Sequence, residues 1–533
     1  MKEIKVERTA SRGIVIAPVY RYGEGDLTPE KYKISVEQQA LEKEKFHMAR
    51  TVVLADLKKL AAVNDVFSAH LEMAGDFTLA ERVYHNIEEN QNVQMAVAGA
   101  IRDVAAVFDA MEDGYLKERG DDIRDLGKRF LAALKGVTLP DLGCLDREVI
   151  VVARDLYPSD TVKLNADFVK GIITEEGGLT SHVSIFAKNM NIPILVGVKG
   201  IQDEVKEGCI VCMDARAGQI VVDPDEDTRT EYSKKREAEE RHLKALAAVR
   251  RAIPITREGK RIRLCANVGS VREIRRGLEM NIDGVGLFRS ERLYMEGKHL
   301  PTEEEQFHVY REAALLVPEE LTVRTLDIGG DKPLSQFNME KEENPFLGWR
   351  AIRICLEHQN MFKQQLRAIL RASAYGHVRI LFPMIVSLEE FREAKKLTEI
   401  CKAELQKEKI PFDGNIELGI MMETPSSVLL ADEFAKEADF FSIGTNDLTQ
   451  YLLAVDRGNK KVAGLYDPFH PAVQKAIRLI TEAGHRQHIP VGICGELAGD
   501  PKALPGLLSA GLDELSMSPS CLDEIRSRIL IYP

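Results

Sequence analysis

The chain of 533 residues is long enough for two to four domains, each with a hydrophobic core of its own. Charged residues make up 29% and hydrophobic residues 44%, as in an ordinary globular protein, and the formal net charge of -12 argues against nucleic acid or an anionic membrane surface as a partner. No apolar run is long enough to span a bilayer, and the first residues lack the apolar core of a signal peptide. We therefore expect a cytoplasmic protein that does not insert into a membrane.

The first part of the chain combines a short extended segment with long helical patterns. Residues 1–25 contain the apolar run Gly-Ile-Val-Ile-Ala-Pro-Val-Tyr, which is too short to fold alone and is expected to complete a sheet formed later in the chain. Apolar residues then recur at three- and four-residue spacing over residues 41–60, 66–83, 93–111 and 115–134. Four antiparallel helices with short connections are the simplest packing of these segments.

Strand patterns return over residues 148–152, 168–174, 194–197 and 209–222, which predicts a compact α/β unit interrupted by the helices. Eight cysteines scattered over such a length do not form a disulfide framework. Cys209 and Cys212 have Cys-x-x-Cys spacing, but residues three apart on a strand face opposite sides. We interpret both as packing residues rather than as metal or redox ligands.

A loop within this α/β unit has the features of a phosphate site. It reads Gly-Gly-Leu-Thr-Ser-His and lies between the strand pattern of residues 169–174 and a helical pattern over residues 183–190. Backbone amides, the hydroxyls of Thr180 and Ser181 and the helix start would favour an anion there. His182 could simply cap or pack the turn, but a capping histidine needs neither two glycines nor two hydroxyls beside it. We therefore favour His182 as a nucleophile that accepts a phosphoryl group.

Residues 228–251 are dense in Lys, Arg and Glu and have few apolar positions. A helix that is polar on nearly all sides commonly bridges two domains through solvent. We interpret this segment as a linker helix, with a plain solvated surface helix as the alternative.

Strands and helices alternate in the second half of the chain. The strand candidates are residues 261–268, 284–288, 322–328, 378–384, 417–422, 440–443, 491–494 and 514–517. Eight strands with helices between them predict a (β/α)8 barrel, although the count alone also fits a doubly wound open sheet. Polar residues at the carboxyl ends of several strands favour the barrel, because these ends meet at one mouth.

The polar residues at these strand ends have a coherent chemistry. Guanidinium and ammonium groups can neutralise and orient a phosphate and a carboxylate, and the candidates are Arg289, Arg324, Lys332, Arg350 and Arg457. Glu423 and Asp447 offer hard oxygen ligands suited to Mg2+. Each residue alone could form a surface ion pair, but their shared position at one end of the barrel favours a binding site.

Several motifs make the sequence similar to a known family. Gly-Gly-Leu-Thr-Ser-His-Val-Ser-Ile-Phe-Ala-Lys closely resembles the phosphohistidine signature of the phosphoenolpyruvate-using phosphotransferases, which include enzyme I of the sugar phosphotransferase system, phosphoenolpyruvate synthase and pyruvate phosphate dikinase. Gly-Val-Gly-Leu-Phe-Arg-Ser-Glu, Arg-Thr-Leu-Asp-Ile-Gly-Gly-Asp-Lys and Cys-Gly-Glu-Leu-Ala-Gly-Asp are similar to phosphoenolpyruvate-binding motifs of enzyme I, in family order. The helical insertion favours enzyme I, because in that family it carries the docking surface for the phosphocarrier protein HPr.

The resemblance implies roles for individual residues. His182 would carry the phosphoryl group, Cys494 would donate a proton, and Asn446 would contact the substrate. The phosphate contacts would be Arg289, Arg324 and Arg457, and the metal ligands Glu423 and Asp447. The HPr-binding surface would include Phe67, His70, Leu71 and Met73, with core packing as the alternative for each of them.

The resemblance also implies an α/β multidomain architecture. A swivelling phosphohistidine α/β domain would comprise residues 1–25 and 138–223, with a helical HPr-binding insertion at 26–137, a linker helix at 224–252 and a phosphoenolpyruvate-binding (β/α)8 barrel at 253–533 that forms a homodimer. The chain would phosphorylate itself from phosphoenolpyruvate, release pyruvate and pass the phosphoryl group to HPr in the first step of sugar uptake. The alternatives are a phosphoenolpyruvate synthase or dikinase, a nitrogen-regulatory paralogue, a barrel lyase acting on pyruvate-like enolates, and a sensor without catalysis.

Overall fold

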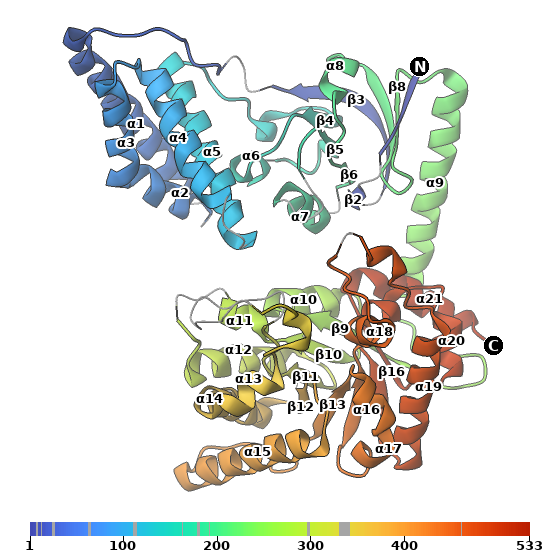
Figure 1. Cartoon of the computed structure of the whole chain (residues 1–533). Coiled ribbons are helices and arrows are strands. Elements are labelled where there is room, and N and C mark those ends of the chain that lie inside the picture. The colour runs from blue at the N-terminus through green and yellow to red at the C-terminus, as the bar shows by residue number, and fades with distance from the viewer. Residues whose placement is uncertain are drawn as a thin grey trace. The chain divides into compact units, whose positions relative to one another are not determined.

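The computed structural model describes the chain except for residues 7–8, 12, 24–26, 62–65, 110–113, 163, 178–181, 191, 296–298, 330–341 and 460. For some residues inside helices, His182 among them, it describes the backbone and not the side chain. The chain divides into two compact units, Met1–His242 and Leu243–Pro533, and each is described by itself (Figure 1).

The first unit contains a mixed eight-stranded sheet in the order β1-β8-β7-β3-β4-β5-β6-β2. Its strands are β1 (Lys2–Lys5), β2 (Thr9–Ser11), β3 (Ile14–Tyr22), β4 (Val149–Ala153), β5 (Val169–Thr174), β6 (Ile194–Leu195), β7 (Ile210–Asp214) and β8 (Gln219–Val222). β3 lies in the middle, parallel to β4 and antiparallel to β7. The prediction that the extended segment near the N-terminus completes a later sheet is therefore confirmed.

Alternation along the central strands places apolar side chains on both faces of this sheet. In β4, Val149 and Val151 join one hydrophobic cluster, whereas Ile150 and Val152 join the cluster on the opposite face. The sheet is flanked by α6 (Pro158–Val162), α7 (His182–Asn189) and α8 (Ile201–Glu204). α7 is held in place by Val183 and Ala187, which are buried in the first of these clusters.

The predicted strand over residues 209–222 is wrong as a single element, because the structure has a hairpin of β7 and β8 there. The carboxylate of Asp214 accepts the backbone N–H groups of Arg216 and Ala217 at 2.9 and 2.8 Å, and Gly218 adopts a φ of 66°, so the chain reverses. Cys209 and Cys212 lie in different hydrophobic clusters and both are free thiols, as the packing interpretation predicts.

Between β3 and β4 the chain forms a helical bundle. Its helices are α1 (Gln39–Ala61), α2 (Val66–Gly75), α3 (Phe77–Glu88), α4 (Val93–Asp109) and α5 (Gly114–Lys135). The prediction of four helices is wrong by one within the described residues, because the pattern over residues 66–83 divides at Asp76. The Asp76 carboxylate accepts the Thr78 N–H at 2.7 Å and caps the start of α3.

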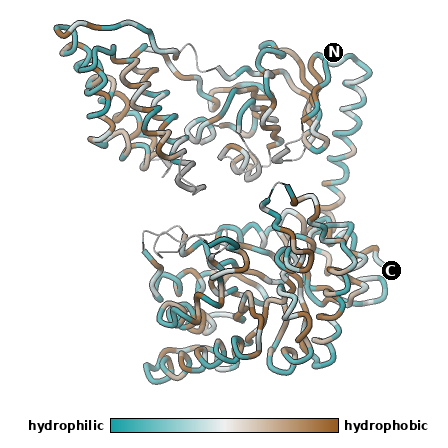
Figure 2. Tube along the Cα trace, in the orientation of Figure 1, coloured by the Kyte–Doolittle hydropathy of each residue, from teal (hydrophilic) through white to brown (hydrophobic). Residues whose placement is uncertain are grey.

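The charged segment predicted as a linker forms one helix, α9 (Glu226–Val249), and the division between the two units falls inside it. Figure 2 shows that most of α9 is hydrophilic. Near its start Tyr232 packs against Cys212 and Val221 of the first unit. Just beyond its end Arg250 pairs with Asp523 of the second unit at 2.6 Å. Each of these contacts lies within one unit.

The second unit is a closed barrel of eight parallel strands. The strands are β9 (Arg263–Val268), β10 (Gly284–Arg289), β11 (Leu321–Arg324), β12 (Val378–Phe382), β13 (Leu418–Met422), β14 (Phe440–Ile443), β15 (Val491–Ile493) and β16 (Glu514–Met517). β9 pairs with both β10 and β16, which confirms the predicted barrel and excludes the open sheet. The third strand ends at Arg324, four residues before its predicted end.

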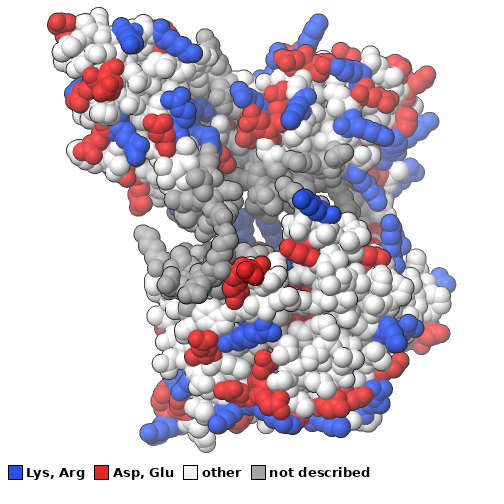
Figure 3. All heavy atoms as spheres, viewed as in Figure 1, with Lys and Arg blue, Asp and Glu red and all other residues white. Residues whose placement is uncertain are grey.

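Helices surround this barrel (Figure 1). They are α10 (Val271–Glu279), α11 (Glu291–Met295), α12 (Glu303–Leu316), α13 (Ile352–Glu357), α14 (Gln359–Ala372), α15 (Leu388–Glu408), α16 (Pro425–Leu429), α17 (Ala431–Phe434), α18 (Thr445–Leu453), α19 (Pro471–Arg486), α20 (Leu504–Ser509) and α21 (Leu522–Ile531). Within the described residues, none of the helices is both long and apolar enough for a bilayer crossing. On the face shown in Figure 3, basic and acidic side chains are interspersed.

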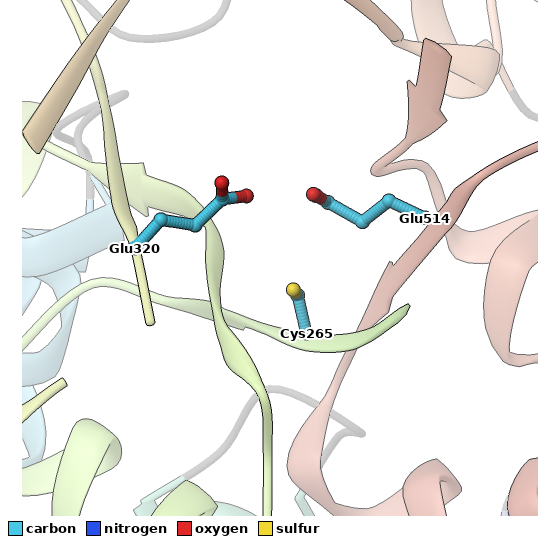
Figure 4. Close-up of side chains that lie close together, drawn as sticks. All are labelled: Cys265, Glu320 and Glu514. Carbon is cyan, nitrogen blue, oxygen red and sulfur yellow. The ribbon is translucent and has the colours of Figure 1, made fainter. Parts of the chain in front are cut away.

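The amino-terminal ends of the barrel strands enclose a buried charged cluster, which we call the barrel floor. Figure 4 shows Cys265, Glu320 and Glu514, whose ligand atoms lie within 4.8 Å of one another as in a metal site. However, Arg263 and Arg379 each pair with both carboxylates, with nitrogen–oxygen distances of 3.6 and 3.4 Å to Glu514. Because two guanidinium groups already neutralise the acids, the floor is a structural ion cluster rather than a metal centre.

The two floor carboxyl groups titrate differently. Burial and the neighbouring Glu320 raise the pKa of Glu514 to about 7. Burial would also raise the pKa of Glu320, but the Arg379 and Arg263 guanidinium groups outweigh it and lower that pKa. The two groups hydrogen-bond to each other. The folded barrel therefore keeps one proton between two buried carboxyl groups.

This shared proton predicts a pH dependence of stability. Because the pKa of Glu514 is raised on folding, its stabilising proton is fully present below the unfolded-state pKa and is lost as the pH rises through about 7. Replacing Glu514 by Gln removes this titration. The unfolding free energy of E514Q relative to the parent should thus increase, on the order of 1–3 kcal/mol, between pH 5 and pH 8. Chemical unfolding of both proteins measures it, and a constant difference across this range would contradict the shared proton.

Candidate active site

The site residues predicted in the second half of the chain lie at the carboxyl ends of the barrel strands. Arg289 and Arg324 are the last residues of β10 and β11. Glu423 and Cys494 directly follow β13 and β15, and Asp447 lies in the first turn of α18 after β14. Since all eight strands are parallel, these positions share one mouth, opposite the floor.

Arg324 is fixed at this mouth by two carboxylates. Its side chain is buried, and its guanidinium group pairs with Glu291 and, at 2.9 Å, with Asp327 Oδ2. Burial alone would lower the pKa of Arg324, but Glu291 and Asp327 outweigh it and raise the pKa, so the group stays charged. A buried permanent cation of fixed orientation is suited to bind a phosphoryl or carboxylate oxygen.

Arg350 is buried beside Arg324 and shares one partner with it. Its Nη2 donates to Asp327 Oδ1 at 2.9 Å and to Asp447 Oδ2 at 3.3 Å, and its Nη1 donates to the Tyr451 hydroxyl at 3.1 Å. Asp327 therefore joins the two arginines through its two oxygens. Its position between them keeps both guanidinium groups at the mouth.

Glu423 is 1% exposed. Burial raises the pKa of Glu423 to about 8, with further contributions from Asp447 and Asp327 that the two arginines oppose. Its Oε1 accepts the Met384 N–H at 2.7 Å, and Met384 adopts a φ of 59°, a conformation rare for a residue other than glycine. Such backbone strain is common at functional sites.

Glu423 and Asp447 fit a divalent cation. Asp447 Oδ1 is buried without a hydrogen-bond partner among the described residues. A Cβ atom at Gly444 would come within 2.7 Å of Glu423 Oε2, so the glycine keeps space beside that oxygen. Two carboxylates, one of them with an unpartnered oxygen, suit a hard cation that takes its other ligands from water or substrate.

The Cys494 thiol is 3% exposed and lies inside the barrel, below the charged groups. It packs with Leu287, Leu381, Met421 and Phe440. Burial raises the pKa of Cys494 to about 11, so the thiol keeps its proton at neutral pH. A protonated thiol at this position can act as a general acid.

The remaining barrel candidates are more open or lie outside the described part. Arg289 and Arg457 are exposed and are available to a ligand, and the backbone N–H of Arg457 donates to Gln450 at 3.2 Å. The half-buried Asn446 accepts the Glu496 N–H at 3.1 Å. Lys332 lies outside the described residues, so the structure gives it no position.

The candidate phosphohistidine loop is described only in part. β5 ends at Thr174, Gly177 adopts a φ of 96°, and α7 begins at His182, as the sequence predicts. Thr180, Ser181 and the His182 side chain lie outside the described part. What the structure supplies is a helix of eight residues, anchored in the core, whose first residue is His182.

The four residues predicted to bind HPr are placed unequally on α2. Phe67 and His70 are 1% and 0% exposed, and His70 Nε2 lies 3.1 Å from Asp122 on α5. For these two side chains the alternative of core packing holds, because the bundle interior surrounds them. Leu71 and Met73 are half-buried at the edge of the bundle core. Only these two could contribute to a docking surface without rearrangement.

Sequence reasoning missed several polar groups at the mouth. Glu291 lies in a motif that the resemblance used, but its pairing with Arg324 gave no local signal. The Asn267 side chain on β9 donates to the Cys494 carbonyl at 2.7 Å and accepts the Ser516 hydroxyl at 2.7 Å. A polar residue within an apolar strand was the signal that could have identified Asn267.

Three family models match the chain. The PEP-binding domain of the PEP-utilising enzymes matches residues 244–531, their mobile domain matches residues 145–218, and their N-terminal domain matches residues 8–119. The barrel mouth with its arginines, carboxylates and thiol falls within the first match. The fold and the site thus define a PEP-utilising enzyme, in which PEP is phosphoenolpyruvate.

Similar curated proteins show to which group of PEP-utilising enzymes the chain belongs. Proteins named phosphoenolpyruvate-protein phosphotransferase are 42% identical in Staphylococcus aureus (strain Mu50 / ATCC 700699), 43% in Priestia megaterium and 42% in Geobacillus stearothermophilus. The alignments cover 98% of this chain and 92–93% of each relative. The chain therefore belongs to the phosphoenolpyruvate-protein phosphotransferases, the enzyme I family.

The proton on Glu423 predicts how a divalent cation binds. Below a pKa of about 8 the cation must displace this proton, so Mn2+ affinity should rise by up to about tenfold per pH unit between pH 6 and 8 and then level off. Electron paramagnetic resonance of free Mn2+ measures it. E423Q should bind weakly at every pH, whereas E437Q, which changes an exposed ion pair with Arg392, should retain the parental profile. A parental affinity that is independent of pH would contradict the assignment of Glu423.

Proposed function

We propose that this protein transfers the phosphoryl group of phosphoenolpyruvate to His182 and then to a histidine of the phosphocarrier HPr, and releases pyruvate, as the first step of sugar uptake by the phosphotransferase system. The observation that carries the proposal is the meeting of Arg324, Arg350, Glu423 and Asp447 above the Cys494 thiol at one barrel mouth. These groups suit a phosphorylated enol carboxylate.

The arginines bind and orient the substrate. Arg289, Arg324 and Arg457 contact the phosphoryl oxygens, Lys332 and Arg350 add positive charge, and Asn446 supplies a hydrogen bond. Since phosphoryl transfer is promoted mainly by positioning and by neutralising oxygen charge, permanent cations are the groups that the reaction requires. Support comes from Arg324 and Arg350, which are already fixed by Asp327 before any substrate binds.

Glu423 and Asp447 would hold the divalent cation, which we infer to be Mg2+ because both ligands are hard carboxylates. Bound there, the ion would neutralise charge on phosphoryl oxygens. The unpartnered Asp447 Oδ1 and the space kept by Gly444 beside Glu423 support this role.

The chemistry is completed by two further groups. A ring nitrogen of His182 forms a bond to phosphorus while the bond from phosphorus to the enol oxygen breaks, and the electron pair stays on the enolate. The Cys494 thiol then donates its proton to the enolate carbon, which gives pyruvate and a thiolate that solvent reprotonates. The raised pKa of Cys494 supports this role, because the thiol must be protonated when the enolate forms.

The reaction needs His182 to meet two partners in turn, the substrate and HPr. We infer that the phosphohistidine domain, residues 1–25 and 138–223, swivels on the linker at residues 224–252 relative to the barrel at residues 253–533. The insertion at residues 26–137 would dock HPr, with Leu71 and Met73 as the half-buried candidates. We also infer a homodimer formed through the barrel and a location in the cytoplasm.

The other functions considered are less well supported. A synthase or dikinase needs a nucleotide-binding module, for which the sequence between the matched domains leaves no room. A lyase would leave the His182 loop without a role. A nitrogen-regulatory paralogue or a phosphorylation sensor would be supported instead if the protein failed to pass phosphate to HPr.

Radiolabelled phosphoenolpyruvate tests the proposal. With Mg2+ the parent protein should incorporate an acid-labile, base-stable label, release pyruvate and label added HPr. His182→Ala should lose both labels by at least about a thousandfold, whereas His308→Ala, which changes an exposed histidine on α12 of the barrel, should behave like the parent. A labelled H182A protein, or an acid-stable label on the parent, would refute the nucleophile.

A further inference from the structure

Gln365 on α14 is a buried polar residue that the proposed reaction does not use. It is 1% exposed, and its neighbours on the same helix, Phe362, Leu366 and Ile369, are fully buried and apolar. Burying an amide costs free energy unless its hydrogen bonds are made. An apolar residue would fill the same space, so the amide calls for an explanation beyond packing.

Two of the three hydrogen bonds of this amide reach residues next to the ends of β10 and β11, and the third reaches α12. Its Oε1 accepts the backbone N–H of Leu326 at 2.9 Å, and its Nε2 donates to Ser290 Oγ at 3.0 Å and to the Tyr310 hydroxyl at 3.2 Å. Because a backbone N–H can only donate, the oxygen of the amide must face Leu326 and the orientation of the side chain is settled.

Ser290 carries the connection to Arg324. Its hydroxyl accepts from Gln365 and donates to the backbone carbonyl of Arg324 at 2.8 Å. Gln365 and Ser290 therefore hold the chain at the end of β11 on both sides of Thr325, at the Arg324 carbonyl and at the Leu326 N–H. The next residue after Ser290 is Glu291, which pairs with the Arg324 guanidinium group.

The Ser290 and Gln365 side chains form hydrogen bonds where the backbone pairing of β10 with β11 ends. Arg289 and Arg324 are the last paired residues of β10 and β11. Beyond this point Thr325 still donates to Leu381 of β12 at 2.9 Å, but on the β10 side Ser290 and Gln365 take over from the ladder. On its β10 side, the segment that carries Arg324 and Asp327 to the mouth is thus fixed by side-chain hydrogen bonds instead of strand pairing.

We propose that Gln365 is a positioning residue for phosphoryl transfer, which holds Arg324 in its phosphate-binding place through Ser290 and Leu326. The inference rests on the proposed function, since it takes Arg324 as a substrate contact. A second branch of the network runs from Tyr310 to Gln306 at 3.2 Å, away from the mouth, and serves packing between α12 and α14. The two branches make different predictions for substrate binding.

Steady-state kinetics of the full-length protein with phosphoenolpyruvate, Mg2+ and HPr test the inference. Gln365→Met and Ser290→Ala should each raise the KM for phosphoenolpyruvate about tenfold, the equivalent of one lost buried hydrogen bond, and leave the KM for HPr unchanged. Both changes cut the same connection, so the double variant should be no worse than about twofold beyond either single variant.

Two matched controls separate positioning from general loss of stability. Tyr310→Phe cuts only the outer branch, and Thr481→Val removes a buried hydroxyl on α19 that bonds to Ile477 at 2.9 Å within its own helix. Both should keep the KM for phosphoenolpyruvate within about twofold of the parent. S290A is a small change that preserves the fold even if Q365M does not.

The results distinguish this inference from the proposed function. A parent protein that does not phosphorylate HPr would overturn the proposed function. An active parent whose S290A and Q365M variants match T481V in KM would overturn only the role of Gln365. An equal rise of KM in Y310F would also overturn it, because the effect would then follow packing and not the connection to Arg324.

Discussion

The active site depends on one carboxylate, Asp327, placed between two buried arginines. Each of its oxygens lies 2.9 Å from a guanidinium nitrogen, one of Arg324 and one of Arg350. Without it the two cations would repel each other at close range in a poorly hydrated space. Arg350 also reaches Asp447, so the arginine that we propose to orient the substrate and the acid that we propose to hold the cation are positioned together. The charged groups of the site are therefore already positioned before a ligand binds.

The barrel contains guanidinium–carboxylate clusters at both ends. The two clusters differ in how many of their charged groups are left to bind a ligand. At the floor, Arg263 and Arg379 each pair with Glu320 and Glu514, and the acids share a proton, so both carboxyl groups already have partners. At the mouth, Asp447 Oδ1 has no partner among the described residues, Glu423 holds a displaceable proton, and Arg289 is exposed. The exposed arginine, the unpartnered carboxylate oxygen and the raised pKa of Glu423 make the mouth the candidate binding end of the barrel.

The sequence predicted the barrel because each strand is a short apolar run that stops at a polar residue. The same pattern located Arg324, Glu423 and Cys494, since parallel strands bring their carboxyl ends together. It could not predict which buried polar groups meet. Gln365 and Ser290 are 75 residues apart. Apolar periodicity predicts which face of a helix is buried, but it does not predict which residue a buried amide bonds to. Phe67 and His70 likewise had an apolar pattern that fits a core or a docking surface equally well.

Binding of phosphoenolpyruvate by a protein that cannot turn it over tests the central claim most directly. Calorimetric titration of His182→Ala with phosphoenolpyruvate and Mg2+ should show one site per barrel, and adding Asp327→Asn should weaken that site at least about tenfold while the barrel stays folded. Unchanged affinity in the double variant would mean that the arginines are not held for the substrate by Asp327. It would contradict the account of the mouth given above.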